Sequence, residues 1–169
     1  MQQAPIPPDE DKRLEALARL GILDTPREER FDRITKEVTE KLRVPISTIS
    51  IIDKNREWYK SCQGLSGTEA DRSISFCAHA LLAKNVFVVE DTSKDQRFAD
   101  NPMVVGPPYI RFYAGVVLSD NQTGQPIGVL CAKDTKPHAM SMKELDVLLG
   151  LARQAESEIN KRPLNTKKR

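Results

Sequence analysis

The amino-acid sequence predicts an α+β fold in which helices pack on a central antiparallel sheet of five to six strands. Apolar residues recur at helical spacing near both ends of the chain, and the middle alternates apolar with polar residues in short runs joined by turns. Strands joined by hairpins pair antiparallel, so terminal helices are left to cover a face of the sheet. A length of 169 residues fits one domain.

Two helices are predicted before the strands. Residues 9–20 carry leucines on one stripe and are followed by Gly21, a residue that commonly ends helices. Residues 25–28 read Thr-Pro-Arg-Glu, which predicts a capping box at the start of the second helix. Four apolar residues then follow at helical spacing over 31–42, so we expect this helix to bury one face and to end before Pro45.

The middle of the chain predicts a hairpin, a short helix and a further strand. Residues 47–53 alternate isoleucine with polar residues, and a polar turn leads to the returning strand at 58–62. A glycine-containing loop is expected at 64–71. A serine is suited to cap a short helix within 73–82, and residues 86–89 form a strand.

A long segment from Asp91 to Pro108 predicts a structured loop. It holds three prolines and many polar residues, yet four apolar side chains in it require burial: Phe98, Met103, Val104 and Val105. Loops of this length in a compact domain are usually lids or binding loops.

Two strands and a helix complete the predicted elements. Residues 110–118 and 126–132 form strands joined by a polar turn. The last helix begins with a second capping box at 141–144 and continues to about Ile159.

Four segments of the chain carry a family resemblance. They read LGILDTPREERFDRIT at 20–35, ISFCAHALL at 74–82, DTSKDQRFADNPMVVGPPYIRFYAG at 91–115 and GQPIGVLCAKDTKP at 124–137. Over residues 14–159 the chain resembles the GAF domain, above all the subgroup found N-terminal to bacterial histidine kinases and diguanylate cyclases. The resemblance implies a GAF/PAS-like arrangement. The N- and C-terminal helices cover one face of the sheet, and the short helix with the long loop roofs a small-molecule pocket on the other.

The resemblance also implies domain boundaries and partners. We expect an N-terminal extension at 1–13, the GAF domain at 14–159 and a basic, disordered tail at 160–169. The terminal helices are expected to pair in a homodimer and to pass a signal to an output domain or protein. The chain then either stands alone or belongs to a longer signalling protein.

Composition excludes several classes of function. The net charge of +2 offers no general field for nucleic acid or an anionic membrane, and no run of 18 apolar residues or signal peptide occurs, so we expect a cytoplasmic protein. Three cysteines without C-x-x-C spacing predict reduced thiols and no metal site. The sequence identifies no cofactor, and it lacks the phosphate-binding loops of common nucleotide-binding folds.

We expect a non-enzymatic sensory domain whose unidentified ligand contacts the short helix, the long loop and the strand that follows. The predicted ligand-binding residues are Phe76, Cys77, His79, Asp91, Phe98, Asn101, Arg111 and Tyr113. A guanidinium beside a phenol is suited to hold a carboxylate or a polar ring. Alternatively, Arg111 orders the loop by pairing with one of three aspartates, Asp91, Asp95 or Asp100.

Cys77 and His79 do not predict a catalytic dyad. Side chains two positions apart on a helix diverge by about 200°, because each residue turns about 100°. The simpler interpretation is a buried thiol and a hydrogen-bonded histidine that support the helix. Attachment of a linear tetrapyrrole at this cysteine is disfavoured by spacing and chain position, and the signature of cyclic-nucleotide-binding GAF domains is missing.

Two alternative functions remain open. A dimerisation scaffold that binds nothing predicts a pocket filled by four aromatic residues, Phe76, Phe98, Phe112 and Tyr113. An enzyme built on the same fold, free methionine-R-sulfoxide reductase, uses three cysteines, and this chain contains Cys62, Cys77 and Cys131. That alternative predicts loss of activity on Cys77→Ser or Cys62→Ser.

Overall fold

The fold is built on one six-stranded antiparallel sheet in the order β3-β2-β1-β6-β5-β4. The structure is a computed structural model that describes residues 1–161, so the predicted basic tail at 160–169 lies almost wholly outside the described residues. The strands are β1 (Ile46–Ile52), β2 (Arg56–Gln63), β3 (Glu69–Asp71), β4 (Val86–Val89), β5 (Phe112–Ser119) and β6 (Pro126–Asp134).

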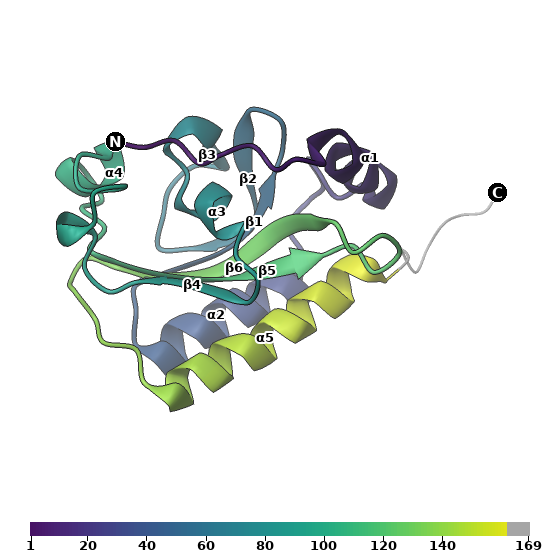
Figure 1. The fold of residues 1–169 in the computed structure, drawn as a ribbon. Helices are drawn as coiled ribbons and strands as arrows, with labels where there is room; N and C mark the ends of the chain where they lie inside the picture. The colour runs from purple at the N-terminus through teal and green to yellow at the C-terminus, as the bar shows by residue number, and fades with distance from the viewer. Residues whose placement is uncertain (162–169) are drawn as a thin grey trace.

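Two long helices cover one face of the sheet, which we call the helix face. They are α2 (Glu29–Leu42) and α5 (Met142–Asn160), which lie side by side beneath the strands (Figure 1). The first helix, α1 (Glu10–Leu20), lies apart from this pair near the β5–β6 turn. There Arg19 forms an ion pair with Asp120, whose nitrogen and oxygen are 2.7 Å apart.

The opposite face of the sheet, the roof face, is covered by shorter elements. These elements form the roof: the helix α3 (Phe76–Ala80) and the segment 91–111, which contains η2 (Thr92–Lys94) and α4 (Pro102–Val105). The N-terminal residues cross this side of the molecule before α1 begins (Figure 1). The expected arrangement, with long helices on one face and a short helix and loop on the other, is confirmed.

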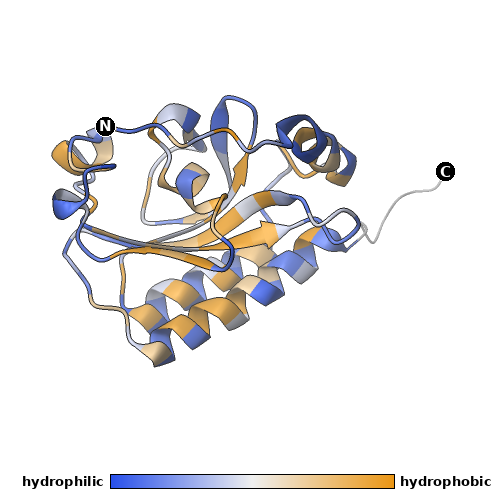
Figure 2. Ribbon diagram, in the orientation of Figure 1, coloured by the Kyte–Doolittle hydropathy of each residue, from blue (hydrophilic) through white to orange (hydrophobic). Residues whose placement is uncertain are grey.

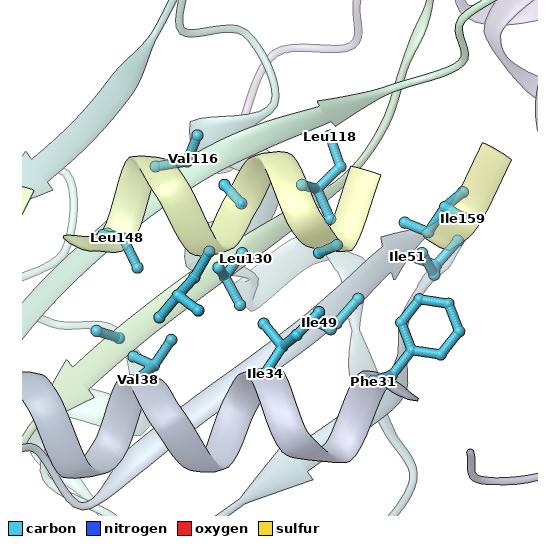
Figure 3. Close-up of a cluster of buried hydrophobic side chains, with 14 of the residues drawn as sticks. Phe31, Ile34, Val38, Ile49, Ile51, Val116, Leu118, Leu130, Leu148 and Ile159 are labelled. Carbon is cyan, nitrogen blue, oxygen red and sulfur yellow. The ribbon is translucent and has the colours of Figure 1, made fainter. Parts of the chain in front are cut away.

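The main hydrophobic core lies between the sheet and the helix face. Figure 3 shows Phe31, Ile34 and Val38 of α2 pointing toward the strands, with Leu148 and Ile159 of α5 beside them. These five side chains are at most 5% exposed. Both helices turn polar residues outward (Figure 2), as amphipathic helices on a sheet do.

Several predicted element ends are confirmed in detail. Gly21 adopts the left-handed conformation directly after α1, and Ser75 accepts a hydrogen bond from the amide of Ala78 at the start of α3. At α5 the side chains of Ser141 and Glu144 form the predicted capping box. No helix in residues 1–161 is long and apolar enough to cross a membrane.

The predicted capping box at Thr25 is wrong. Helix α2 begins only at Glu29, and its N-cap residue Glu28 makes no side-chain cap hydrogen bond. The buried ammonium of Lys60 instead donates to the Thr25 hydroxyl at 2.8 Å and to the Pro26 carbonyl at 2.6 Å. Together with the Glu28 carboxylate, 2.7 Å from the same ammonium, these acceptors satisfy a buried charge and hold residues 25–28 in a non-helical conformation.

Two other local predictions also need correction. The segment expected to be a loop at 64–71 contains β3, whose three residues pair with β2 although they show no apolar alternation. Val105 was expected to be buried but is 63% exposed, because the short α4 turns Met103 and Val104 inward and leaves Val105 on its outer side.

Candidate ligand site beneath the roof

Three aromatic side chains pack together between the roof and the sheet. Phe76 of α3 stacks on Phe98 with ring centroids 4.4 Å apart, and Tyr113 of β5 lies 5.4 Å from Phe76. All three are 0% exposed. Phe112 points to the helix face instead, where it joins the main core. Three of the four aromatic residues expected in a filled pocket are therefore brought together, and the fourth is not.

A buried polar cluster lies beside these rings. Its members come from β1, β2, β5, β6, α3 and the N-cap residue of α3, and each is at most 9% exposed. We define the polar cluster as Thr48, Ser50, Glu57, Tyr59, Ser75, Cys77, Tyr113, Cys131 and Lys133. The apolar helix face and this polar roof face therefore belong to the same strands, because successive strand residues point to opposite sides of a sheet.

Short hydrogen bonds connect most of the cluster around Glu57. Its two carboxylate oxygens accept from the hydroxyls of Ser50 at 2.5 Å and Ser75 at 2.6 Å. Thr48 lies 2.7 Å from the Ser50 hydroxyl and 3.0 Å from the sulfur of Cys131. These contacts satisfy a buried carboxylate, which would otherwise be costly to remove from water.

Lys133 is the cation of the cluster. Its Nζ lies 5.9 Å and 6.0 Å from the ring centroids of Phe76 and Tyr113, and its side chain is 1% exposed. Burial lowers the pKa of Lys133, but negative charge on Cys131 and Glu57 outweighs this effect and raises it. The lysine is therefore charged at neutral pH.

Cys77 and His79 make separate contacts, in agreement with the divergence predicted from their spacing. The Tyr113 hydroxyl donates to the sulfur of Cys77 at 3.1 Å. His79 Nε2 instead donates to the carbonyl of Gln2 at 3.0 Å, and its ring packs edge-on against Phe98. Cys77 therefore belongs to the polar cluster, while His79 joins the N-terminal residues to the outside of the roof.

Asp91, Asn101 and Arg111 organise the roof. Asp91 caps η2 by accepting from Ser93, and Asn101 caps α4 while its amide donates to the Ile74 carbonyl at 3.0 Å. The expected pairing of Arg111 with a loop aspartate is wrong. Its guanidinium donates to the carbonyls of Val104 at 2.8 Å and Ile110, so it orders the loop through backbone acceptors.

Glu57 and Lys133 were missed as site residues by the sequence analysis. A usable signal was present in β6, where Val129, Cys131 and Lys133 alternate with apolar residues and must share one face. The lysine was overlooked because its strand was expected to end at Ala132. Residues 1–161 contain no cluster of histidine, cysteine and carboxylate side chains that could hold a metal.

Four hollows on the surface of the described residues lie outside the polar cluster. One is formed beneath the N-terminal segment, by Gln3, Ile6 and Arg72 among others. Another lies between β5 and α5, at Val117 and Leu149. No member of the polar cluster lines either hollow. A ligand reaching the cluster would therefore have to displace side chains of the roof.

The chain resembles known proteins along most of its length. It is 40% identical over 149 residues to a cyclic di-GMP phosphodiesterase of Pseudomonas aeruginosa, a match that covers 88% of this chain and 25% of that protein. The chain thus spans a quarter of the length of this curated relative.

Solved structures share the fold at low sequence identity. The GAF domain of an Acinetobacter phosphoenolpyruvate-protein phosphotransferase is 20% identical, with a TM-score of 0.65 and coverage of 88% of this chain and 93% of that one. A free methionine-R-sulfoxide reductase from Neisseria meningitidis, solved with its substrate, is 16% identical, with a TM-score of 0.62 and coverage of 95% and 96%. Identities this low concern the fold alone.

A family match agrees with this architecture. Residues 26–159 match the GAF domain family, and the matched region extends from the start of α2 to the end of α5, so it includes the whole sheet and the roof. The chain belongs to the GAF domain family.

Proposed function

We propose that this GAF domain is a sensor that binds a small molecule in the polar cluster beneath the roof. The observation that carries the proposal is the polar cluster itself, which places Glu57 and Lys133 on a sheet face that an inert core would fill with apolar side chains. Buried charges cost stability unless they are paired, and replacing them with apolar residues is often stabilising. A site that keeps buried charges despite this cost is suited to recognise a ligand.

Signal transmission is proposed to start in the roof. Cys77 and Phe76 belong to α3, and Tyr113 is the second residue of β5, the strand that pairs with both β4 and β6. A ligand that displaces the rings would shift the roof relative to the sheet, on whose other face α2 and α5 lie. The ligand would then select one of two helix arrangements, because it binds one better than the other.

An attached signalling output is part of the same proposal. The Pseudomonas relative is named a cyclic di-GMP phosphodiesterase and is about four times as long as the matched segment. We propose that this domain likewise regulates an output domain or partner protein, as a homodimer joined through its terminal helices.

Native mass spectrometry tests the sensor proposal. Freshly purified protein is compared with the same sample after denaturation, and we expect a non-covalent mass that is lost on denaturation. The spectrum also reports whether the chain is a dimer. A clean apo protein, together with no binding in a small-molecule screen, would contradict the sensor proposal.

A scaffold without a ligand is the second candidate. It is favoured by the tight packing of Phe76, Phe98 and Tyr113, which occupy the space that a ligand would take. The same spectrum separates the two proposals, because the scaffold predicts an apo dimer.

The reductase alternative has weaker support. Cys77 and Cys131 are 0% exposed, and burial raises the pKa of Cys77 and of Cys62. Thiol chemistry needs a thiolate that a substrate can reach. Burial raises the pKa of Cys131, but a hydrogen bond from Cys77 and the charge of Lys133 outweigh it and lower this pKa to about 7, yet the thiol is fully buried. A reductase assay on Cys62→Ser and Cys77→Ser variants tests it.

A further inference from the structure

We infer that the N-terminal residues 1–9 form a strap that holds the roof closed, and that release of this strap lets the roof open. The inference goes beyond the proposed ligand-binding function and stands whether or not a ligand binds. It is carried by the contacts of Gln2, which join the two parts of the roof from outside, and by the course of the strap from the roof to α1 (Figure 1).

The backbone of Gln2 clamps the two parts of the roof together. Its amide donates to the carbonyl of Arg97, in the loop 91–111, at 3.2 Å. Its carbonyl accepts from Nε2 of His79, in α3, at 3.0 Å. The ring of His79 packs edge-on against Phe98 of the same loop, with centroids 4.7 Å apart. Gln2 therefore lies over the contact between helix and loop and is bonded to both.

The other end of the strap is fixed to the sheet through α1. The Pro7 carbonyl accepts from the amide of Glu10 at 3.1 Å, and Pro7 is buried. Glu10 pairs with Arg13 and Arg72, and the Arg13 guanidinium donates to the Ile52 carbonyl, at the end of β1, at 2.7 Å. The strap thus connects the sheet to the outer side of the roof. The roof can move away from the sheet only if Gln2 releases it or α1 is pulled along.

Between its two ends the strap makes few contacts. Residues 3–6 form no hydrogen bond within the described part of the chain, and Ile6 is 59% exposed. A hollow lies beneath them, beside Arg72. The amino group of Met1 pairs with Asp100, but at an exposed site, where such pairs contribute little. Segments with so few buried contacts detach at a small cost in free energy, so the strap can leave while the rest of the fold persists.

Three prolines stiffen the strap. Pro5, Pro7 and Pro8 have a restricted φ and no amide proton to satisfy. A stiff segment has fewer conformations to lose when it docks, which favours its return after release. The strap is therefore suited to open and close reversibly. The competing explanation is a passive covering that adds to overall stability and does not control the roof.

Thiol labelling of the whole chain tests the strap. Cys77 is fully buried beneath the roof, with its sulfur 3.1 Å from the Tyr113 hydroxyl, so iodoacetamide can reach it only when the roof opens. When closing is faster than labelling, the labelling rate follows the population of the open state. Cys62 lies in β2, outside the roof, and is partly exposed, so it serves as the internal reference.

Two variants weaken the clamp from opposite sides. Gln2→Pro removes the amide that donates to Arg97, and His79→Phe keeps a ring against Phe98 but removes the donor to Gln2. We expect each to label Cys77 about two- to tenfold faster, the effect of one lost hydrogen bond, without a change at Cys62. Gln3→Pro is the matched control. The Gln3 amide has no acceptor within residues 1–161, so this variant should label at the parent rate.

Hydrogen exchange read by mass spectrometry shows where the variants open. Exchange should rise in peptides from α3 and from the loop 91–111 and stay at the parent rate in β1 and β6. An equal rise in roof and sheet would overturn the inference in favour of the passive covering. Unchanged Cys77 labelling in both clamp variants, or the same increase in Gln3→Pro, would also overturn it. Native mass spectrometry decides separately on the sensor proposal.

Discussion

Gly115 lies in β5 next to the Tyr113 hydroxyl and shows how tightly the roof face is packed. A Cβ added there would overlap with that hydroxyl and approach Cγ1 of Val129 to 2.8 Å. Gly150, in α5, has no atom within 4 Å of the corresponding position. The two glycines therefore offer the same substitution in opposite surroundings.

We expect Gly115→Ala and Gly150→Ala to change stability in opposite directions. Overpacking should make Gly115→Ala less stable by about 1–3 kcal/mol. Gly150→Ala should be more stable by about 0.5–1 kcal/mol, because alanine favours a helix more than glycine does. Urea unfolding of both variants measures this. A neutral Gly115→Ala would mean that the roof face is loosely packed.

Glu10 links three elements through charge. Its carboxylate pairs with Arg13 in α1 and with Arg72, which follows β3, and Arg13 also donates to the carbonyl of Ile52 at the end of β1. Burial raises the pKa of Glu10, but the hydrogen bonds from Arg13 and Arg72 outweigh it and lower the pKa to about 2.

Acid should therefore weaken the fold through Glu10. Its pKa is lower in the folded chain than in the unfolded chain, so its stabilisation is complete above the unfolded value of about 4.3 and is lost as the pH falls toward 2. Urea midpoints between pH 5 and pH 3 should fall less steeply in Glu10→Gln than in the parent protein. Glu37→Gln, which removes an exposed partner of Lys41, serves as the control and should keep the parent slope.

At the scale of elements, the loop 91–111 is held down by one ring. Phe98 stacks on Phe76 of α3 and contacts the ring of His79, whose centroid lies 4.7 Å away. Val105, in the same loop, is mostly exposed.

Phe98→Ala should cost about 3–5 kcal/mol of unfolding free energy, because it opens a cavity under the roof. Val105→Ala should change it by less than about 0.5 kcal/mol. Denaturant unfolding provides both values. If the two variants proved equally mild, the loop would not be part of the cooperative fold.

Elements marked by regularly spaced apolar residues or by a local capping motif were predictable from the sequence. Elements whose bounds depend on tertiary contacts were not. The apolar spacing of α2 and the capping box of α5 are local properties, so the sequence suffices for them. The start of α2 depends on Lys60, a residue far along the chain, and β3 exists only because β2 offers it an edge. Neither contact leaves a local pattern.

For the whole molecule, the two faces of the sheet differ in composition: the helix face holds the main hydrophobic core, and the roof face holds the polar cluster. The aromatic members of the candidate site were predicted, since Phe76, Phe98 and Tyr113 lie in the segments that resemble the GAF domain. Glu57 and Lys133 were not, because their importance arises where hydrogen-bonded strands place them opposite hydroxyls and thiols. Such a cluster depends on strand register, which alternation alone leaves open.

The position of Trp58 gives the molecule a built-in optical reporter. This residue is the only tryptophan of the chain, is 6% exposed and packs in the core of the helix face, on the far side of the sheet from the roof. A compound that merely fills space under the roof should leave its emission unchanged. A shift in tryptophan fluorescence on adding a compound would show that the disturbance has crossed the strands and reached the layer formed by α2 and α5.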